Sequence, residues 1–388
     1  MMGKWENCTI ADLGTVVGGA TPSTKRSENF EGGTIAWITP KDLAGFKGRF
    51  ISHGERNLTE KGLKSCSAQM MPKHTILFSS RAPIGYVAIA SNEVCTNQGF
   101  KSIVPNDRID YMFLYYLLLY YKNNIKQMAS GTTFKEISGK AMRSIKVCIP
   151  EAKEEQIKIS SILSAIDSKI EENERINKNL LQQAGAIFNK FYDESPNQQP
   201  FTSLIEVFGG GTPKTGNRDF WDGPIPFFTP KDVGTPYTFQ TEKYITESGL
   251  AHCNSRLYHK DTTFVTARGT VGKVSLAGIP MAMNQSCYAL ASEIVDPLLV
   301  YFYVLKAVAS LKHKASGAVF DAIVTRDFDS ETINVLSDDD AKSVLAIINP
   351  MMEAIHNNSE ENIRLVALRD SLMPRLMSGE IDVSDIDF

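Results

Sequence analysis

Apolar residues recur at intervals of three and four along two long stretches of the chain. One stretch runs from Glu151 to about Phe191 and the other from about Asp338 to Met377. This spacing predicts two continuous helices, each with one apolar seam. The seam positions are Ile159, Ile162, Ile166, Ile170, Asn173, Ile176 and Leu180 in the first helix, and Val344, Ile348, Met351, Ile355, Asn362, Leu365 and Leu372 in the second.

The ends of both stretches carry helix signals. Each begins with carboxylates, which offset the exposed amides at a helix N-terminus. Gly185 and Pro374 stand at equivalent places near the C-terminal ends, where we expect a bend, and Gly379 is a plausible C-cap. Two helices of about 60 Å, at 1.5 Å per residue, cannot leave their seams in water, so we expect an antiparallel pair. The alternative is that each helix packs only on its own neighbouring domain.

The stretches before each helix mix short β-like runs, such as 75–78 and 262–266, with Gly, Pro and Asn. That pattern is typical of a compact α+β domain. We therefore divide the chain into a first domain (1–150), a first helical spacer (151–195), a second domain (196–335) and a second helical spacer with an acidic tail (336–388). In an antiparallel pair, Asn173 and Asn362 would face the seam and fix its register.

The second half of the chain repeats the first at a displacement of 186 to 191 residues. Six short matches keep their order along the chain, which indicates a tandem duplication. With the two helices antiparallel, the repeats would be related by a pseudo-twofold axis. The matches are Gly18-Gly19-Ala20-Thr21-Pro22 with Gly209-Gly210-Gly211-Thr212-Pro213, Ile38-Thr39-Pro40-Lys41-Asp42 with Phe228-Thr229-Pro230-Lys231-Asp232, Thr59 to Leu63 with Thr246 to Leu250, Arg81 to Gly85 with Arg268 to Gly272, Asn97-Gln98 with Asn284-Gln285, and Ser130, Gly131, Phe134 and Ile137 with Ser316, Gly317, Phe320 and Ile323.

Composition adds only exclusions. The 388 residues are 43% hydrophobic and 22% charged, as in folded proteins, so a disordered or collagen-like chain is excluded. Six scattered Cys without a CxxC pair and no signal sequence indicate a reduced, cytoplasmic protein. The longest apolar run, 111–121, is too short to cross a bilayer, which needs about 20 residues.

The net charge of -3 hides an asymmetry between segments. Residues 1–150 carry +8, 151–200 carry -3, 201–335 carry -1 and 336–388 carry -7. A basic first domain is typical of a protein that binds a polyanion, because neutralised phosphates release counterions. The alternative is an ordinary solvated surface, and the second domain adds no support.

Catalytic and metal motifs are only approximated. The run Gly209 to Thr215 resembles a phosphate-binding loop, but Pro213 has no amide hydrogen where the motif needs glycine. The chain has no Pro-Pro dipeptide and so lacks the loop of amino-methyltransferases, and Glu151-Ala152-Lys153 has nuclease spacing without a partner acid. His252, Cys253 and His259 form a weak group, so we expect no metal and no catalysis.

Basic and polar loop residues are the better candidates, and they point to nucleic acid. Arg81 and Arg268 precede glycine turns, where a guanidinium can fork onto a guanine or clamp a phosphate. The alternative is that they pair with Asp42 and Asp232 for the fold. Residues that differ between the repeats are better placed to read different bases. The candidates are Lys25, Arg26, Lys47, Arg49, Arg81, Thr132, Thr133 and Lys135 in the first repeat, and Lys214, Arg218, Lys243, Arg268, Lys312 and Lys314 in the second.

These features resemble the DNA-specificity subunits of type I restriction-modification systems. The likeness spans the chain and depends most on the paired Thr-Pro-Lys-Asp segments and on the closing stretch from Leu368 to Ile381. It implies two target-recognition domains that read the halves of a bipartite double-stranded DNA site, with the helical pair as a ruler. It also implies two modification subunits that carry S-adenosylmethionine and methylate adenine, with restriction subunits joining to translocate and cleave DNA.

On this reading the chain itself is non-catalytic and binds no cofactor. The outward helix faces are candidates for docking the partners, although an ordinary solvated face is an equal interpretation. The docking candidates are Glu171, Glu172, Glu174, Glu360, Glu361 and Arg364. The unequal domain charges predict weak DNA affinity for the chain alone. The alternatives are a stand-alone nuclease or methyltransferase, and a coiled-coil scaffold whose two domains bind protein ligands.

Overall fold

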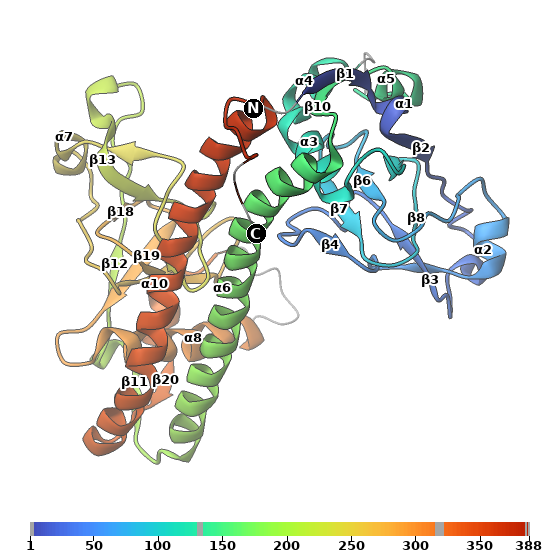
Figure 1. Cartoon of the computed structure of the whole chain (residues 1–388). Helices are drawn as coiled ribbons and strands as arrows, with labels where there is room; N and C mark the ends of the chain where they lie inside the picture. The colour runs from blue at the N-terminus through green and yellow to red at the C-terminus, as the bar shows by residue number, and fades with distance from the viewer. Residues whose placement is uncertain (1–3, 130–134, 315–321, 385, 387–388) are drawn as a thin grey trace. The chain divides into compact units, whose positions relative to one another are not determined.

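A computed structural model describes residues 4–129, 135–314, 322–384 and 386. The chain separates into two compact units, one of Met1–Glu171 with Arg364–Phe388 and one of Glu172–Ile363. Two long helices, α6 (Lys153–Glu194) and α10 (Asp338–Met377), contribute a segment to each unit (Figure 1). Each unit is therefore a sheet-containing domain together with one segment of each long helix.

The first domain holds three small sheets. A five-stranded sheet has the order β2-β9-β6-β7-β4, a three-stranded sheet β5-β3-β8, and a two-stranded sheet β1-β10. The strands are β1 (Trp5–Thr9), β2 (Gly14–Gly18), β3 (Ile35–Ile38), β4 (Phe50–Ile51), β5 (Asn57–Leu58), β6 (Ile76–Phe78), β7 (Val87–Ala90), β8 (Cys95–Thr96), β9 (Lys101–Pro105) and β10 (Lys146–Pro150). The short helices are α1 (Ile10–Leu13), η1 (Ser27–Asn29), α2 (Glu60–Lys64), α3 (Tyr111–Tyr120), α4 (Lys122–Gln127) and α5 (Gly139–Arg143).

The second domain repeats this topology. Its sheets have the orders β12-β19-β16-β17-β14, β15-β13-β18 and β11-β20. The strands are β11 (Gln198–Pro200), β12 (Glu206–Gly209), β13 (Trp221–Phe228), β14 (Tyr237–Thr238), β15 (Tyr244–Ile245), β16 (Thr263–Thr266), β17 (Val274–Ala277), β18 (Ala282–Met283), β19 (Cys287–Ala291) and β20 (Thr332–Asn334). The helices are η2 (Phe201–Ser203), η3 (Arg218–Phe220), α7 (Glu247–Ala251), α8 (Pro297–Lys314) and α9 (Thr325–Asp329).

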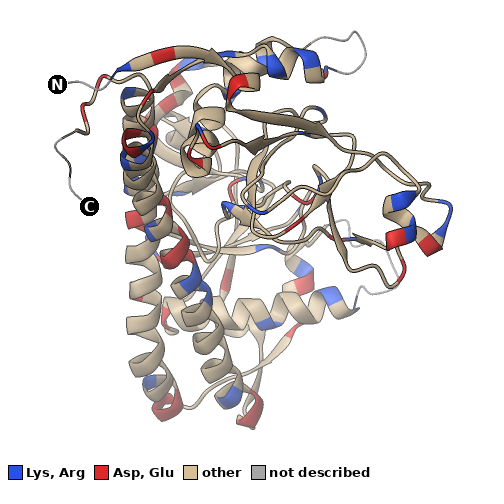
Figure 2. Ribbon diagram, turned by 45° about the vertical axis from the view of Figure 1, so that its right-hand side comes forward, with Lys and Arg blue, Asp and Glu red and all other residues tan. Residues whose placement is uncertain are grey.

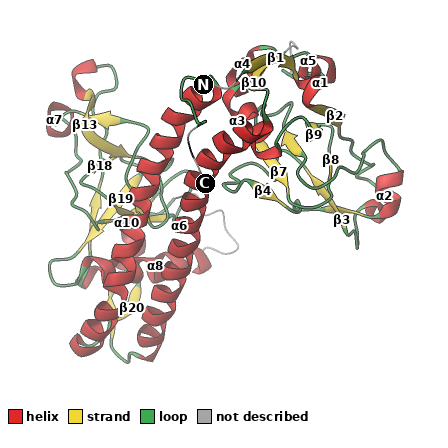
Figure 3. Ribbon diagram, in the orientation of Figure 1, coloured by secondary structure: helices red, strands yellow, loops and turns green. Residues whose placement is uncertain are grey.

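The matching strand orders confirm the α+β class and the duplication predicted from the sequence. The pairing agrees in direction as well: β4 lies parallel to β7 and β14 parallel to β17, while β3 is parallel to β8 and β13 to β18. Figure 3 shows the same mixture of short strands and loops in both domains. The repeated sequence motifs therefore mark repeated structural positions.

Each domain has its own apolar core, which includes part of the helical pair. The apolar run at 111–121 forms α3, whose residues 113–118 are all buried in the first core. That core also contains Ile159 and Leu163 of α6 and Leu376 and Met377 of α10. No helix within the described ranges is long and apolar enough to cross a membrane.

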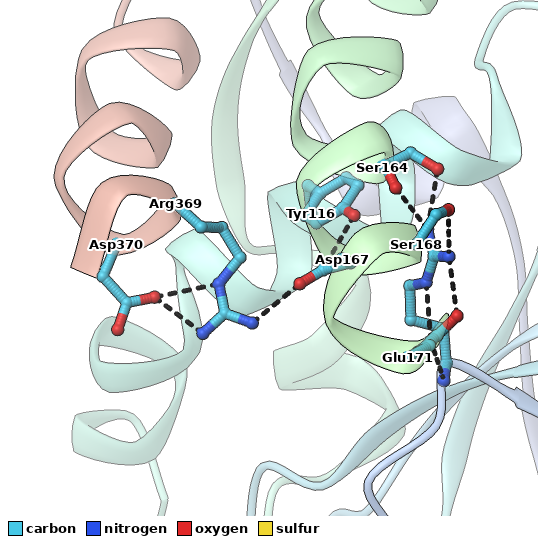
Figure 4. A network of polar contacts seen from close by, with 8 residues as sticks. Tyr116, Ser164, Asp167, Ser168, Glu171, Arg369 and Asp370 are labelled. Atoms are coloured by element: carbon cyan, nitrogen blue, oxygen red, sulfur yellow. Dashed lines mark hydrogen bonds and ion pairs between the residues drawn. The ribbon is translucent and has the colours of Figure 1, made fainter. Parts of the chain in front are cut away.

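Within each unit the segments of α6 and α10 run antiparallel, as predicted. In the second unit the Asn173 amide nitrogen donates to Asn362 Oδ1 at 2.9 Å, and that of Asn177 donates to Ser359 Oγ at 3.2 Å. In the first unit the Arg369 guanidinium bonds Asp167 at 2.8 Å, and Asp167 also accepts the Tyr116 hydroxyl at 2.6 Å (Figure 4). Residues that come later in α6 therefore contact residues that come earlier in α10.

The buried face of α6 differs from the predicted seam. Ile159 is buried, but Ile162, Ile166, Ile170, Ile176 and Leu180 are only half-buried. Asn173, a predicted seam position, is buried as expected, and the buried face also includes Leu163 and two polar residues outside the predicted seam, Asp167 and Asn177. The seam assigned to α6 was partly wrong because it followed apolar residues, while polar groups bonded to α10 occupy several inner positions.

The α10 seam contains mainly the residues that its spacing indicates. Val344, Ile348 and Ile355 are buried, while the other four predicted positions are half-buried. These four are Met351, Asn362, Leu365 and Leu372.

The ends of α10 follow its sequence signals. The Ser337 hydroxyl accepts from the Asp340 amide at 3.2 Å at the start. Gly379, with φ of +77°, donates its amide to Leu376 O at the end. Both long helices continue through Gly185 and Pro374, the positions where bends were expected.

Candidate nucleic-acid interface

The repeated motifs, distant in sequence, meet at one place on each domain. In the first domain the segment after β2 crosses the segment after β8, and the Ala20 amide donates to Thr96 O at 3.0 Å. A Cβ at Gly19 would lie 2.1 Å from Asn97 O, so only glycine permits this crossing. The crossing brings Thr21 beside Gln98, and the Thr21 hydroxyl donates to Gln98 Oε1.

The second domain contains the same crossing. The Gly211 amide donates to Met283 O at 3.2 Å, and a Cβ at Gly210 would lie 2.1 Å from Asn284 O. The Thr212 hydroxyl donates to Gln285 Oε1. The Gly-Gly and Asn-Gln motifs are thus two halves of one feature.

The repeated Thr-Pro-Lys-Asp segment fixes the loop beside this crossing. Asp232 Oδ2 accepts from the Thr229 amide at 2.8 Å and the Thr229 hydroxyl at 2.6 Å, and its Oδ1 accepts from the Glu242 amide at 2.7 Å. Asp42 makes the same three bonds to Thr39 and to the amide of Glu55, each at 2.7 Å. The interpretation that these aspartates pair with Arg81 and Arg268 was wrong, because backbone amides and threonine hydroxyls engage both carboxylates.

Arg81 and Arg268 lie shortly after β6 and β16, next to the same crossing. The amide before Arg81, on Ser80, donates to Gly99 O at 2.7 Å, and the amide of Ala267 donates to Ser286 O at 2.8 Å. Arg81 lies 3.8 Å from Glu136, whereas the backbone of exposed Arg268 bridges Ala322 at the corresponding place. Among the described residues, Arg268 therefore has no acidic partner like the one beside Arg81.

We call these assemblies the repeat clusters. They are Thr21, Lys41, Arg56, Arg81, Asn97 and Gln98 in the first domain, and Thr212, Lys231, Lys243, Arg268, Asn284 and Gln285 in the second. In the second domain Lys231, Lys243, Arg268 and Asn284 line a groove of about 380 Å³. In the first cluster two of the three cations have a carboxylate partner, since Lys41 pairs with Glu55 at 2.6 Å and Arg81 with Glu136 at 3.8 Å. In the second cluster Lys231 pairs with Glu242 at 3.3 Å.

Several sequence-predicted residues adjoin these clusters. Lys25 and Arg26 are exposed on the turn that follows Thr21, and Lys214 and Arg218 occupy the equivalent turn after Thr212. The Trp221 indole donates to Lys214 O at 3.3 Å, and the Lys243 ammonium lies 5.4 Å from the centre of its ring. The turns that differ between the repeats thus flank the parts that are shared.

Sequence reasoning did not include Lys41, Arg56, Gln98 and their counterparts Lys231 and Gln285 among the candidates. Their signal was the duplication itself, because most of them fall inside the matched motifs.

Arg49, by contrast, lies inside the protein. Its side chain is 7% exposed and bonds Glu171 at 2.9 Å, Ser164 Oγ at 2.6 Å and Ser168 Oγ at 2.8 Å. The prediction that Arg49 contacts DNA was therefore wrong, because α6 already engages its guanidinium. The same bond makes Glu171 an internal ion-pair partner instead of a docking residue.

The other candidates take various places. Lys47 and Lys135 are exposed. Lys312 donates to Gly272 O at 2.6 Å, and Lys314 pairs with the buried Glu331 at 2.6 Å, so both ammonium groups have partners within the domain. Thr132 and Thr133 lie outside the described residues.

Residues of both charge signs are distributed along the two long helices (Figure 2). Glu172 pairs with Arg175 at 2.5 Å and Glu361 accepts from the Asn173 amide at 2.7 Å, so Glu361 also belongs to the inter-helix contacts. Glu360 and Arg364 are exposed, while Glu174 is half-buried.

The near-miss motifs serve the fold. The Gly211 amide, which a phosphate loop would need, bonds Met283 O. Glu151 pairs with Lys4 at 2.7 Å, and Lys153 donates to Asp107 O at 3.1 Å. Among the described residues, no three His, Cys, Asp or Glu side chains gather as metal ligands would.

Burial also suppresses the reactivity of three thiols. It raises the pKa of Cys8 to about 11 and the pKa of both Cys95 and Cys287 to about 12, so these groups stay protonated at neutral pH.

Known proteins with similar sequences belong to one family. The family described as "Type I restriction modification DNA specificity domain" matches residues 2–182 and 200–365. The MjaIX type I specificity subunit of Methanocaldococcus jannaschii is 30% identical over 410 residues, covering 98% of this chain and 94% of that protein. The HindI specificity subunit of Haemophilus influenzae is 24% identical over 425 residues, covering 83% and 89%.

A solved structure shares the fold. The S subunit of a type I restriction-modification system from M. genitalium superposes with a TM-score of 0.62 at 15% identity, covering 96% of each chain. Two family matches in tandem cover most of the sequence, and a relative at 30% identity extends over nearly all of it. The chain therefore belongs to the family of type I restriction-modification DNA specificity subunits.

Proposed function

We propose that this chain directs a type I restriction-modification complex to a bipartite double-stranded DNA site. Each domain would place its repeat cluster against the backbone of one half-site and read bases with the flanking turns. The helices α6 and α10 would fix the unspecified spacer between the halves. The chain would perform no catalysis of its own.

The observation that carries this proposal is the presence of the same cationic and amide cluster in both domains. Lysine and arginine side chains neutralise phosphates, and arginine and amide groups bond their oxygens without regard to sequence. A contact of that kind is shared by any two half-sites. Base contacts must differ, and the flanking turns, with Lys25 and Arg26 in one domain and Lys214 and Arg218 in the other, do differ.

We infer the partners from the family to which the chain belongs. Two modification subunits would dock on the helical pair, carry S-adenosylmethionine and methylate adenine, and restriction subunits would join them in the cytoplasm. The exposed charges at Glu172, Glu360 and Arg364 are the proposed docking groups. The cofactor would belong to the partners instead of this chain.

The test is to co-express this chain with modification subunits from the same genome and to map methylated adenines by single-molecule sequencing. A bipartite motif that disappears when this chain is deleted is the expected result. A methylation pattern that is indifferent to the deletion would contradict the proposal and favour the protein-binding scaffold.

Matched charge reversals locate the interface. Arg268 follows β16 and Lys260 precedes it, and both side chains are exposed. Arg268→Glu should lower methylation at the motif by about tenfold, because a backbone contact is replaced by repulsion. Lys260→Glu makes the same change in charge at the opposite end of the strand and should leave methylation unaltered. Equal effects of the two substitutions would count against the repeat cluster as the DNA contact.

A further inference from the structure

Each repeat cluster contains an exposed glutamine held by a threonine. Gln98 accepts from the Thr21 hydroxyl and Gln285 from the Thr212 hydroxyl. Both glutamines are exposed, and both belong to motifs that the duplication preserved. An identical side-chain pair at the surface of both domains requires an explanation.

The fold at these positions does not depend on the glutamine. Backbone bonds hold the crossing itself, from Ala20 to Thr96 and from Gly211 to Met283. The turn is capped by the preceding asparagine, since Asn97 Oδ1 accepts from the Gly99 amide at 2.8 Å and Asn284 Oδ1 from the Ser286 amide at 3.0 Å.

The threonine determines what the glutamine can offer to a ligand. A hydroxyl donating to Oε1 turns the oxygen toward the protein and engages one of its two lone pairs, while both amide hydrogens stay available to a ligand. Within the described residues, the structure gives Gln98 and Gln285 no further hydrogen-bond partner. Reading adenine would need the amide oxygen and nitrogen together. A phosphate oxygen, which only accepts, matches a donor that stands beside Arg81 or Arg268.

Resting on the proposed DNA-recognition function, we propose that Gln98 and Gln285 each donate a hydrogen bond to one phosphate of their half-site. Thr21 and Thr212 are positioning residues that fix the amide orientation. Because both domains carry the same pair, the contact sets how each domain lies on the duplex and reads no base.

The test uses the complex with its modification subunits and the variants Gln285→Glu and Gln98→Glu. Glutamate keeps the shape and still accepts the threonine hydroxyl, but it has no amide hydrogen and carries a negative charge. Affinity should fall about tenfold, on duplexes with the motif and on duplexes without it, while the methylated motif stays the same. Gln69→Glu, at an exposed position before β6, is the control for the added charge. A complex with this variant should bind DNA as tightly as the wild-type complex.

A second measurement identifies the phosphate. Single methylphosphonates, each of which removes one phosphate charge, are placed in turn along the second half-site. DNA binding is then compared between the wild-type complex and the Gln285→Ala complex. A methylphosphonate at one position should weaken DNA binding by the wild-type complex and should not weaken binding by the Gln285→Ala complex any further. Thr212→Val should lose part of the same affinity, because it frees the amide to rotate.

The outcomes separate this inference from the function on which it rests. A changed base in the motif of Gln285→Glu, with general affinity intact, would make Gln285 a base reader and overturn the phosphate contact. Unchanged affinity and motif in both glutamate variants would also overturn it, while leaving the proposed function in place. The proposed function itself would be contradicted only if no methylated motif depended on the presence of the wild-type chain.

Discussion

Arg49 stands in a basic stretch with Lys47, and at the scale of single residues the two look alike in the sequence. In the fold, Lys47 is exposed while the guanidinium of Arg49 is enclosed by Ser164, Ser168 and Glu171 of α6. The five-donor fork of arginine suits such a site, and the single ammonium of lysine does not. The distinction depends on a helix more than a hundred residues away and could not be predicted from local sequence.

The Arg49 contact predicts a stability defect. Arg49→Ala should lower the free energy of unfolding of the first unit by about 2–3 kcal/mol, less than for a fully buried pair because Glu171 is 34% exposed. Urea unfolding followed by the tryptophans of the first domain measures the effect, with Arg26→Ala, at an exposed site, as the control. Unchanged stability together with weakened DNA binding would restore Arg49 as a DNA contact.

At the scale of elements, the helical pair combines apolar ends with a polar middle. In the first unit Asp167 joins Arg369 to Tyr116, where burial and the nearby Asp167 raise the pKa of the tyrosine hydroxyl far above its ordinary value, so it stays a donor. In the second unit Asn173 and Asn177 bond α10. Apolar spacing predicted that both helices exist and how they pair. It found the inward position of Asn173 but missed those of Asp167 and Asn177, which are visible only through their partners on α10.

Polar groups inside a helical pair fix register at some cost in stability. Asn173→Leu alone should lower the melting temperature, because Asn362 and Glu361 lose the bond from the Asn173 amide, at a cost of about 1 kcal/mol. Adding Asn362→Leu should raise the melting temperature above that of the single variant and allow more than one spacer length in the methylated motif. A single spacer in the double variant would show that the asparagines do not specify register.

At the scale of the whole chain, the duplication could be predicted because the displacement between matches is nearly constant. The sequence did not predict that the repeated motifs meet in one cluster on each domain. The sheet order β12-β19-β16-β17-β14 sets strands beside each other that are not neighbours in sequence, and the loops that leave them meet only through this order. Gly210, Arg268 and Gln285 belong to three separate segments until the sheet is formed.

Continuous helices that enter both units predict a ruler. Four residues added to α6 between 159 and 180 lengthen it by about 6 Å and should change the recognised spacer or abolish pairing, with both half-sites unchanged. Mapping of methylated adenines measures the spacer. Four residues added after Glu293, in an exposed turn of the second domain, should leave it as before. An unchanged spacer in the α6 variant would contradict the ruler.

The core of the first domain includes the end of the chain. Val383 is fully buried there, together with Leu376 and Met377, among residues such as Ile10 and Ile159. During translation, therefore, the second domain can fold before Leu376, Met377 and Val383, which complete the core of the first domain, have left the ribosome. A ribosome that stops early releases a chain whose first domain has an open apolar core, the feature that chaperones and proteases recognise. Truncated copies would thus be removed before they could compete with the full chain.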